Sequence, residues 1–440
     1  MEDSMIFSKT IKVRSAVDVL VAGGGPAGVA AATVCARQGK KVFLVEESGS
    51  FGGLGTVGMV PELMNFDDGE NFLAGGIGKE ISDALFGEIT LNRSSFVVDT
   101  ERLKRLYDEL VISSGAKFSF FTKVIGVEKS TDDTIEYAIL SAPSGMFAVK
   151  ASVFIDCTGS GELCAMADAE FEIGNENGLT MPGTLCSLWG DIDFHKTPLR
   201  DDCKLKEAIE DGIITVNDRL LPGIKRIYGS IGGGNVGHCF NINPIDENSL
   251  TQAIIEARKN LKEYERYYKE YLTGYENMFL CATSNMLGIR ESRRIIGDSK
   301  LIEKHYYEKS SFEDEIGRYS YLIDIHIEKP DDAGYDKFLQ LISMAHGKGD
   351  SYGIPYGALI PKKLRNVLVA GKCISADRKM QASVRVIPCC YITGQAAGVA
   401  AALACDFKGD VRGFDVSVLR SVLKKNGAFL PEIRNTSGKH

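Results

Sequence analysis

Two short stretches of the sequence contain side chains suited to anion binding and proton transfer. In the first, Arg290, Arg293 and Arg294 surround Glu291. Guanidinium groups can hold a carboxylate through two hydrogen bonds or stabilise a developing oxyanion. A solvated face or a salt-bridge network is the alternative interpretation, and we favour it for Arg294 and Glu291. The run is therefore a candidate anion-binding site.

The second stretch contains His326, with Asp324 two positions earlier on the same face of a predicted strand. A carboxylate beside an imidazole can orient the ring and raise its basicity, which suits proton transfer. A structural histidine whose hydrogen bonds are satisfied explains the pattern equally well. Both interpretations of His326 stay open at this point.

The elements that would position a ligand begin near the start of the chain. An apolar strand is predicted over residues 17–22, followed by the glycine turn Gly23–Gly28 and a small-residue helix over residues 29–38. A second apolar strand, over residues 42–45, leads into Glu46. This strand–turn–helix–strand order has the length that a dinucleotide-binding unit needs.

The residue types of this unit fit a bound dinucleotide. Gly23 permits a tight turn, Gly25 lets the backbone approach a pyrophosphate, and Gly28 lets the helix lie close to the sheet. The helix N-terminus offers unpaired N–H groups and partial positive charge to phosphates. At a strand end, Glu46 can accept hydrogen bonds from both ribose hydroxyls. Its carboxylate would repel a 2′-phosphate, which disfavours NADP.

Two further segments are rich in small residues. Residues 49–56 include Gly53 and Thr56, which would allow close approach and offer a hydroxyl; a flexible surface loop is the alternative. Thr158 and Gly159 follow a predicted strand. A threonine–glycine pair at the end of a parallel strand suits a nucleotide contact, although any strand–turn–helix junction has this composition.

The C-terminal part of the chain returns to the first pattern. An apolar strand over residues 364–370 ends at Gly371, and a small-residue helix is predicted over residues 389–403. Arg385 and Val386 stand just before this helix. Its N-terminal dipole would stabilise negative charge on a cofactor, whereas a simple core helix is the alternative.

The middle of the chain, from about residue 168 to 349, has mixed periodicity. The elements predicted there are helices over residues 246–271 and 331–345 and strands over residues 238–242 and 319–327. Gly232–Gly237 is formally another GxGxxG. Because no small-residue helix or later strand-end acid follows it, we predict a loop over the site and not a second dinucleotide site.

Composition limits the class of protein. With 440 residues the chain is too long for one ordinary core, so more than one domain is expected. The net charge of −8 opposes nucleic acid as the main partner. No uninterrupted apolar run is long enough to span a bilayer, so no membrane span is predicted. The 11 cysteines form no CxxC pair and no metal-ligand spacing, which predicts a cytoplasmic protein without a metal.

Eight segments occur in an order that resembles a known family. They are VLVAGGGPAGVAAA, FGGLGT, DCTGSGELC, GIRESRRIIG, YLIDIH, YGIPYGALIP, NVLVAGKCIS and SVRVIPCCYITGQAAGVAAAL. The order resembles that of the bacterial FAD-dependent oxidoreductases of the glutathione-reductase-like flavin superfamily, whose relatives include the fumarate reductase flavoproteins and the heterodisulfide reductase flavoprotein. The resemblance covers most of the chain; it is specific for family, cofactor and fold and unspecific for substrate.

This resemblance implies an α/β fold: a Rossmann-like FAD-binding domain with a central parallel sheet and a three-stranded β-meander, plus an inserted α+β substrate domain. The alternating stretch 117–154 would form the meander. The expected division is residues 1–167 for the first part of the FAD-binding domain, 168–349 for the substrate-side domain, and 350–440 for the second part.

The resemblance also implies roles for single residues. The cofactor-binding residues would be Gly23, Gly25, Pro26, Ala27, Gly28, Glu46, Glu47, Gly53, Thr56, Val124, Thr158, Gly159, Gly371 and Val386. Family position makes Arg290 and Arg293 the better candidates in the arginine run, and His326 and Arg385 complete the expected catalytic set. Lys372 departs from the family, because relatives commonly have arginine after the glycine of this strand.

The expected function is hydride transfer between a small organic substrate and N5 of FAD. One alternative is a flavoprotein subunit that passes electrons to a redox partner protein, as in heterodisulfide reductase assemblies. Another is a non-enzymatic flavin-binding module. Oligomeric state and the need for a redox partner stay open.

Overall fold

The computed structural model describes residues 5–432. Its largest sheet has seven strands in the order β5-β2-β1-β8-β7-β6, with β17 paired beside β8. The strands are β1 (Lys12–Ala22), β2 (Val42–Val45), β5 (Lys117–Ser119), β6 (Lys123–Thr131), β7 (Thr134–Ala142), β8 (Gly145–Asp156) and β17 (Val367–Val369). Strands β5, β2, β1, β8 and β17 pair in parallel, and β6, β7 and β8 form the antiparallel meander. The predicted α/β class is confirmed.

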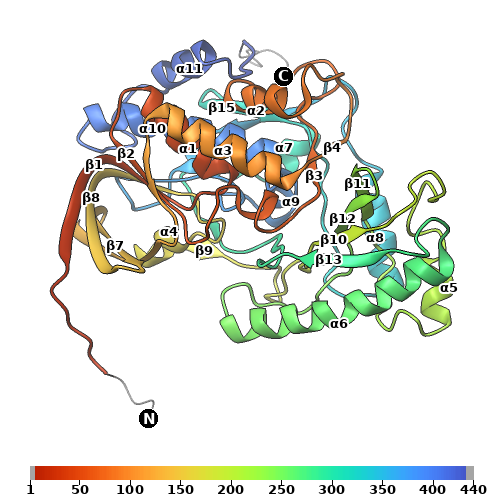
Figure 1. The fold of residues 1–440 in the computed structure, drawn as a ribbon. Coiled ribbons are helices and arrows are strands. Elements are labelled where there is room, and N and C mark those ends of the chain that lie inside the picture. The colour runs from red at the N-terminus through yellow and green to blue at the C-terminus, as the bar shows by residue number, and fades with distance from the viewer. Residues whose placement is uncertain (1–4, 433–440) are drawn as a thin grey trace.

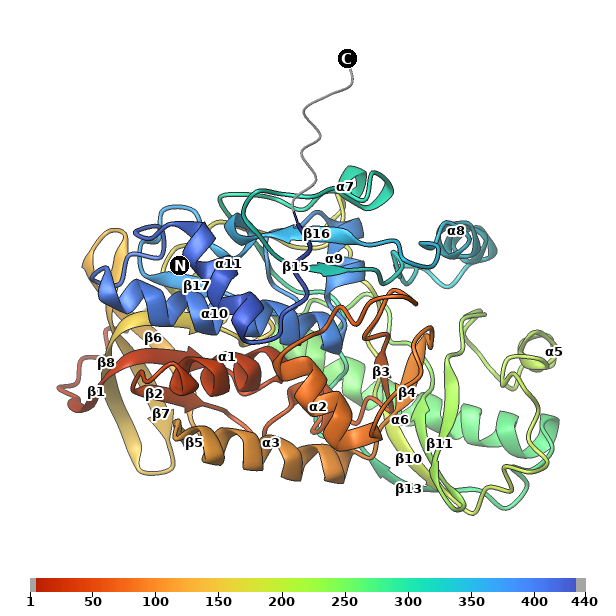
Figure 2. The same ribbon diagram turned by 90° about the horizontal axis from the view of Figure 1, so that it is seen from above.

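The parallel strands are covered on both faces, which explains their continuous apolar sequence. In β1, Val19 and Val21 pack into a core shared with the helices α1 (Pro26–Arg37), α3 (Thr100–Ser114) and α10 (Ile387–Asp406). Leu20 and Ala22 point the other way, into a core shared with the meander. Figures 1 and 2 show α1 and α10, from opposite ends of the chain, lying side by side.

Helix α10 is unusually apolar. Among the described residues it is the single helix whose length and composition would allow it to cross a membrane, yet 89% of that window is buried within the fold. Its Gly394 and Gly398 face α1, where an added Cβ would lie 2.3 Å from the Ala27 oxygen and 2.4 Å from the Ala31 oxygen. The small residues therefore let the two helices touch.

A second, antiparallel sheet forms from the middle of the chain. Its order is β11-β12-β10-β13, with β10 (Ser187–Gly190), β11 (Gly223–Tyr228), β12 (Ile231–Asn235) and β13 (Phe279–Thr283). Helix α6 (Glu247–Tyr271) shares a core with it, in which Trp189 is fully buried. In Figure 1 this sheet and α6 lie at the lower right, beside the large sheet. The boundaries after residues 167 and 349 stay a prediction.

Three local predictions for this region are wrong: the loop over residues 232–237, the strand over residues 238–242 and the strand over residues 319–327. Gly232, Gly233 and Gly234 lie in strand β12 and not in a loop. Neighbouring side chains leave no room for a Cβ at these positions; a Cβ on Gly234 would lie 2.8 Å from Trp189 Nε1. Residues 238–242 form no strand beyond an isolated bridge of Cys239 to Gly183.

The segment after Tyr319 is irregular, although a strand was predicted there through residue 327. Strand β15 (Glu315–Tyr319) ends where that prediction began. The carbonyl groups of Tyr321 and Asp324 accept hydrogen bonds from the side chains of Ser383 and Arg385. These backbone carbonyl groups are therefore hydrogen-bonded to side chains and not to a neighbouring strand.

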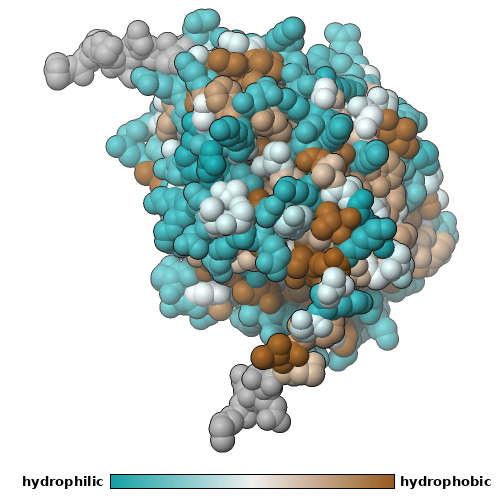
Figure 3. All heavy atoms as spheres, turned by 90° about the vertical axis from the view of Figure 1, so that its left-hand side faces the viewer, coloured by the Kyte–Doolittle hydropathy of each residue, from teal (hydrophilic) through white to brown (hydrophobic). Residues whose placement is uncertain are grey.

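The other described elements are short or lie at the periphery. They are β3 (Glu62–Met64), β4 (Ser95–Val97), β9 (Phe171–Glu172), β14 (Arg294–Ile295), β16 (Tyr352–Pro355), α2 (Ile77–Phe86), α4 (Glu162–Met166), α5 (Leu205–Glu210), α7 (Glu303–Tyr307), α8 (Asp332–Ile342), α9 (Arg378–Val384), α11 (Val416–Lys425), η1 (Gly53–Gly55) and η2 (Tyr356–Leu359). The face at the left of Figure 1 is mostly hydrophilic, with scattered hydrophobic groups (Figure 3).

Candidate functional site

A cavity of about 420 Å³ lies where β1, β2, β8 and β17 end and where α1 and α10 begin. The carboxyl ends of parallel strands are the usual ligand-binding edge of such sheets. Twelve of the predicted site residues line this cavity: Gly23, Gly25, Pro26, Ala27, Glu46, Glu47, Gly53, Val124, Thr158, Gly159, Gly371 and Arg385. Segments separated by more than three hundred residues thus meet at one site.

The glycines of the first turn have different roles. Gly23 has a φ of +92°, and a Cβ there would lie 2.5 Å from the Cys157 oxygen. A Cβ on Gly28 would lie 1.9 Å from the Gly23 oxygen. Gly23 and Gly28 are therefore required for packing. A Cβ on Gly25 would meet no atom within 4 Å, because this position opens onto the cavity.

The beginning of α1 is free to bind an anion. Gly25 is its N-cap and supplies no side-chain cap, and Pro26 occupies the first helical position. The first amides of a helix have no partner within the helix, and its dipole attracts negative charge there. The open position of Gly25 and these free amides fit a pyrophosphate.

Glu46 lies at the end of β2 and is held in place by backbone groups. Its Oε2 accepts from the Gly24 amide at 2.7 Å, and its Oε1 accepts from the Ser48 amide at 2.8 Å. A carboxylate has about four acceptor positions, so both oxygens can still accept from ribose hydroxyls. The side chain is 6% exposed and lines the cavity, as the nucleotide prediction requires.

Thr158 is fixed by a buried carboxylate. Its hydroxyl donates to Asp156 Oδ1 at 2.7 Å, and Asp156 Oδ2 accepts from the Cys164 amide at 2.9 Å. Burial raises the pKa of Asp156 above its ordinary value. On the other side of the cavity, the Gly371 amide donates to Thr393 Oγ1 of α10 at 3.0 Å. Both strand ends are thus anchored.

Six predicted residues do not line this cavity: Gly28, Thr56, Val386, Arg290, Arg293 and His326. Thr56 is buried, and its hydroxyl donates to the Phe51 carbonyl at 2.5 Å, so it stabilises its own turn. Val386 is the N-cap of α10, and its neighbour Ile387 lines the cavity in its place.

Sequence reasoning missed the wall that the middle of the chain provides. Leu250 and Ile254 of α6 line the cavity, as do Met286 and Ile289. The spacing of Leu250 and Ile254 would place them on one helix face, which is the one signal the sequence offered. Lys372 also lines the cavity; its Nζ donates to the Ile289 carbonyl at 2.5 Å, and burial lowers its pKa.

The arginine run is held by protein groups. Arg290 Nη1 donates to the Pro182 carbonyl at 2.8 Å and to Thr184 Oγ1 at 3.0 Å. Burial, assisted by Arg385, lowers the pKa of Arg290 to about 10. Arg293 Nη1 donates to the Ser160 carbonyl at 2.9 Å.

The other two members of the run form a buried ion pair, Arg294 Nη1 to Glu291 Oε1 at 2.5 Å. Glu291 also accepts from Arg378 Nε at 3.0 Å. The salt-bridge interpretation of Arg294 and Glu291 agrees with these contacts. Among Arg290, Arg293 and Arg385, only Arg385 lines the cavity.

Arg385 connects the cavity to Asp324. Its Nη2 donates to Asp324 Oδ2 at 2.7 Å, and its buried Nε has no hydrogen-bond partner among the described residues. Asp324 Oδ2 lies 3.4 Å from His326 Nε2. Burial opposes ionisation of Asp324, but His326, Arg385 and Arg290 outweigh it and hold the pKa of this carboxyl below its usual range.

His326 is buried and neutral near pH 7. Burial and the charge of Arg290 lower its pKa to about 3, although Asp324 acts in the opposite direction. Its Nδ1 lies 3.0 Å from His238 Nε2, and His238 Nδ1 lies 2.7 Å from Asp218 Oδ2. The predicted proximity of Asp324 and His326 is present without a strand.

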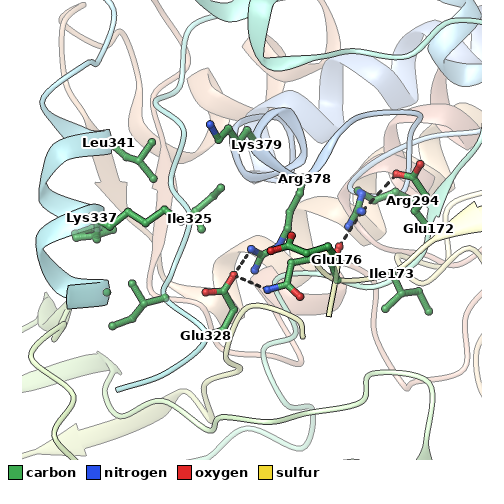
Figure 4. Close-up of a pocket in the computed structure, with 15 residues that line it drawn as sticks. Glu172, Ile173, Glu176, Arg294, Ile325, Glu328, Lys337, Leu341, Arg378 and Lys379 are labelled. Carbon is green, nitrogen blue, oxygen red and sulfur yellow. Dashed lines mark hydrogen bonds and ion pairs between the residues drawn. The ribbon is translucent and has the colours of Figure 1, made fainter. Parts of the chain in front are cut away.

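A larger cavity of about 580 Å³ lies elsewhere and contains none of the predicted site residues. In Figure 4, Arg378 lies beside Glu328 and Arg294 beside Glu172, whereas no interaction joins Lys337 or Lys379 to the other residues drawn. Arg378 Nη1 contacts Glu328 Oε1, and Arg294 Nη2 lies 3.5 Å from Glu172 Oε2. Because the larger cavity contains none of the predicted site residues and the smaller one contains twelve, the smaller cavity is the better candidate. Across residues 5–432 no group of three or more His, Cys, Asp or Glu is arranged to hold a metal.

Comparisons with known proteins give a family match over most of the chain. The profile of the family described as FAD dependent oxidoreductase matches residues 18–423. A stretch of 72 residues is 40% identical to part of a bifunctional amine oxidase of Dictyostelium discoideum; it covers 15% of this chain and spans 7% of that protein's length.

Solved structures give more distant likenesses. A geranylgeranyl bacteriochlorophyll reductase-like protein of Thermoplasma acidophilum is 14% identical, with 94% of this chain and 84% of that chain covered and a TM-score of 0.49. The flavin-dependent brominase Bmp2 is 11% identical, with 93% and 83% covered and a TM-score of 0.46.

Proposed function

The chain belongs to the FAD dependent oxidoreductase family, and on this premise we propose that it transfers a hydride between a small organic substrate and N5 of FAD held in the 420 Å³ cavity. The observation that carries the proposal is the convergence of the first glycine turn, Glu46 and the N-terminus of α10 on one cavity. FAD, when bound, supplies a two-electron donor and acceptor that amino-acid side chains lack.

We assign the ADP half of the cofactor to the β1–α1–β2 unit. The free amides at the start of α1 would bind the pyrophosphate, and the open Gly25 position leaves room for it. Glu46 would accept from the ribose hydroxyls, while Val124 and Glu47 lie on the same wall for the adenosine end.

The opposite wall would stabilise negative charge. Helix α10 begins there without a side-chain cap, so its first amides and its dipole face that part of the cavity. The half-buried Lys372 adds a positive group among apolar neighbours such as Ile387. In a site from which water is excluded, such charges interact more strongly than in water.

Arg385 is the best candidate for holding the substrate. It lines the cavity, and its unpartnered Nε can donate to a carboxylate or another anionic oxygen. Arg290 and Arg293 would then act as fixed charges and supports, since neither lines the cavity. Asp324 holds the Arg385 side chain through the 2.7 Å contact.

The test is anaerobic bleaching of flavin absorbance in the FAD-loaded protein by a panel of small carboxylates, amines and alcohols. We expect bleaching by members of the carboxylate set, and weaker bleaching of Arg385→Lys at equal substrate concentration. Failure to bind FAD would overturn the proposal. So would a bound flavin that no member of the panel reduces and whose reduced form transfers electrons to none of the corresponding oxidised compounds.

A further inference from the structure

The 580 Å³ cavity is separate from the 420 Å³ cavity, because the two have no lining residue in common. Its walls come from the loop of residues 172–176, the segment 325–328, one face of α8 and the start of α9. Figure 4 shows α8 with Lys337 on one side, Arg294 on the other, and Arg378 between them. A cavity of this volume can hold a small molecule.

Part of this cavity wall is apolar. The lining residues of α8 recur at the spacing of one helix face: Gly334, Lys337, Phe338 and Leu341. Phe338 and Leu341 are buried, and Ile325 and Ile327 add two β-branched side chains from the segment before the helix. The hydrocarbon or aromatic part of a ligand would be removed from water against these groups.

The charged side chains at this cavity are largely balanced by protein groups. The ion pairs there are Arg378–Glu328, Arg294–Glu172, Lys300–Glu172 and Lys379–Glu303. Lys337 and Glu176 are exposed lining residues of opposite charge, and neither forms an ion pair with another described residue. Formal charge alone therefore does not decide which ligand group the cavity would accept.

The unmet hydrogen bonds indicate an acceptor. Two buried side-chain atoms of the described lining residues have no hydrogen-bond partner, Arg294 Nε and Arg378 Nη2, and both are donors. Arg294 is 4% exposed and is fixed by hydrogen bonds from Nη1 to Glu291 and from Nη2 to the Gly174 carbonyl. Arg378 is fixed through Nε by the same Glu291, at 3.0 Å. A buried donor without an acceptor is costly, and a guanidinium group binds a carboxylate strongly.

We propose that the 580 Å³ cavity is a second ligand site, which binds a small amphipathic carboxylate. The apolar part of the ligand would pack against Phe338 and Leu341, and its carboxylate would accept from Arg378, with Lys337 as a further cation of the same cavity. An inorganic anion would leave the apolar wall in water, and a pure hydrocarbon would leave the guanidinium donors without an acceptor. The proposal goes beyond the proposed function and does not depend on it, because the 420 Å³ cavity takes no part.

The two cavities are neighbours with separate walls. Asp324, which accepts from Arg385 Nη2 at 2.7 Å, directly precedes Ile325 of the 580 Å³ cavity. Helix α9 begins with Arg378 at this cavity and has Arg385, which lines the other cavity, as its C-cap. At 1.5 Å per residue these two arginines are about 10 Å apart along the helix. The second ligand and FAD are therefore expected to bind at the same time.

The test is isothermal titration with octanoate, on the protein as purified and after loading with FAD. We expect one octanoate per chain with a Kd of about 1 mM or lower in both samples. Acetate has the carboxylate without the apolar part, and octylamine has the apolar part with a cationic head; both should bind at least about tenfold more weakly. No octanoate binding at about 10 mM, or equal affinity for either control compound, would overturn the proposal. Because the titration requires no turnover, a failure of flavin reduction would affect only the proposed function.

Variants locate the bound octanoate. Lys337→Glu reverses an exposed charge at the cavity and should weaken binding by about fivefold or more. Arg378→Lys keeps the charge but removes the planar fork of donors, and a loss of about tenfold is expected.

The matched controls are Lys259→Glu, at an exposed position of α6, and Arg385→Lys in the other cavity; both should stay within about twofold of the wild type. Weaker binding by Arg385→Lys together with wild-type affinity of Lys337→Glu would place octanoate in the 420 Å³ cavity and overturn the second site. Because Lys337 is exposed, its variant decides the matter even if Arg378→Lys does not fold.

Discussion

Gly394 of α10 lies against Ala27 of α1, so close that a Cβ on Gly394 would be 2.3 Å from the Ala27 carbonyl oxygen. Ala27 also lines the 420 Å³ cavity. The contact between two helices from opposite ends of the chain is therefore the place where the fold and the site depend on each other.

The Gly394→Ala variant should lose both stability and cofactor. The added methyl group would force α1 and α10 apart, and overpacking of this kind costs about 1–3 kcal/mol. Urea unfolding and FAD titration measure the two effects. The matched control is Gly126→Ala, where a Cβ would be in ordinary contact with Ile139 at 3.5 Å. Equal stability of the two variants would contradict the close contact.

Two glycines of the same turn should respond differently to substitution. Gly25→Val should leave the unfolding free energy of the FAD-free protein within about 0.5 kcal/mol, because the side chain would enter open space. Its FAD affinity should fall by at least about tenfold, which corresponds to about 1.4 kcal/mol. Gly28→Ala should destabilise the protein itself, because its methyl group would meet the Gly23 oxygen at 1.9 Å. Isothermal titration with FAD and thermal unfolding separate the two cases, and the reverse order would be inconsistent with this turn.

Acid should weaken the protein through His326. Its pKa is lowered to about 3, below the ordinary value near 6.5, so between these values the unfolded chain binds more protons than the folded one. The His326 contribution is therefore complete above about pH 6.5 and is lost as the pH falls toward 3, by at most about 1.4 kcal/mol per pH unit.

The pH series should be run on the wild type, His326→Gln and His195→Gln. Asp324, whose folded pKa is also lowered, contributes stability above its unfolded pKa that is lost only at more acidic pH. The difference in slope between the wild type and His326→Gln from about pH 4 to 6.5 therefore reports on the histidine. We expect a shallower slope for His326→Gln and an unchanged slope for His195→Gln. Equal slopes in all three proteins would rule out the buried neutral state of His326.

Removing the charge of Lys372 should lower the reduction potential of bound FAD. A cation on the cavity wall favours the form of the cofactor with more negative charge, and a loss of about 1–2 kcal/mol corresponds to about 20–40 mV for a two-electron couple. Spectroelectrochemical titration of Lys372→Met measures the shift. Lys372→Arg keeps the charge and should stay within about 10 mV of the wild type. A Met variant with the wild-type potential would exclude an electrostatic role for Lys372.

The nucleotide-binding unit could be predicted because its signals are local. The strand, the glycine turn, the helix and Glu46 follow one another within a short stretch, and each residue type has one physical reason to be there. The structure brings Gly23, Gly25 and Glu46 to one cavity, as expected. The C-terminal pair of β17 and α10 was predictable for the same reason.

The wrong and missed features depend on tertiary contacts. Gly232–Gly234 have the composition of a loop, but their neighbours Ile224, Pro61 and Trp189 leave no space for side chains in strand β12. Met286 lines the cavity although nothing in its own segment indicates a ligand. The roles assigned to the arginine run, to His326 and to the domain boundaries stay predictions until they are measured.

Trp189 is the sole tryptophan of the chain, and it lies fully buried in the second sheet with its indole Nε1 donating to Ser187 Oγ at 2.8 Å. Its fluorescence is therefore a reporter of the middle of the chain alone, while the visible spectrum of FAD reports on the other core. If both signals change together on heating, the molecule melts as one cooperative unit; if they separate, the substrate side can open while the cofactor stays bound.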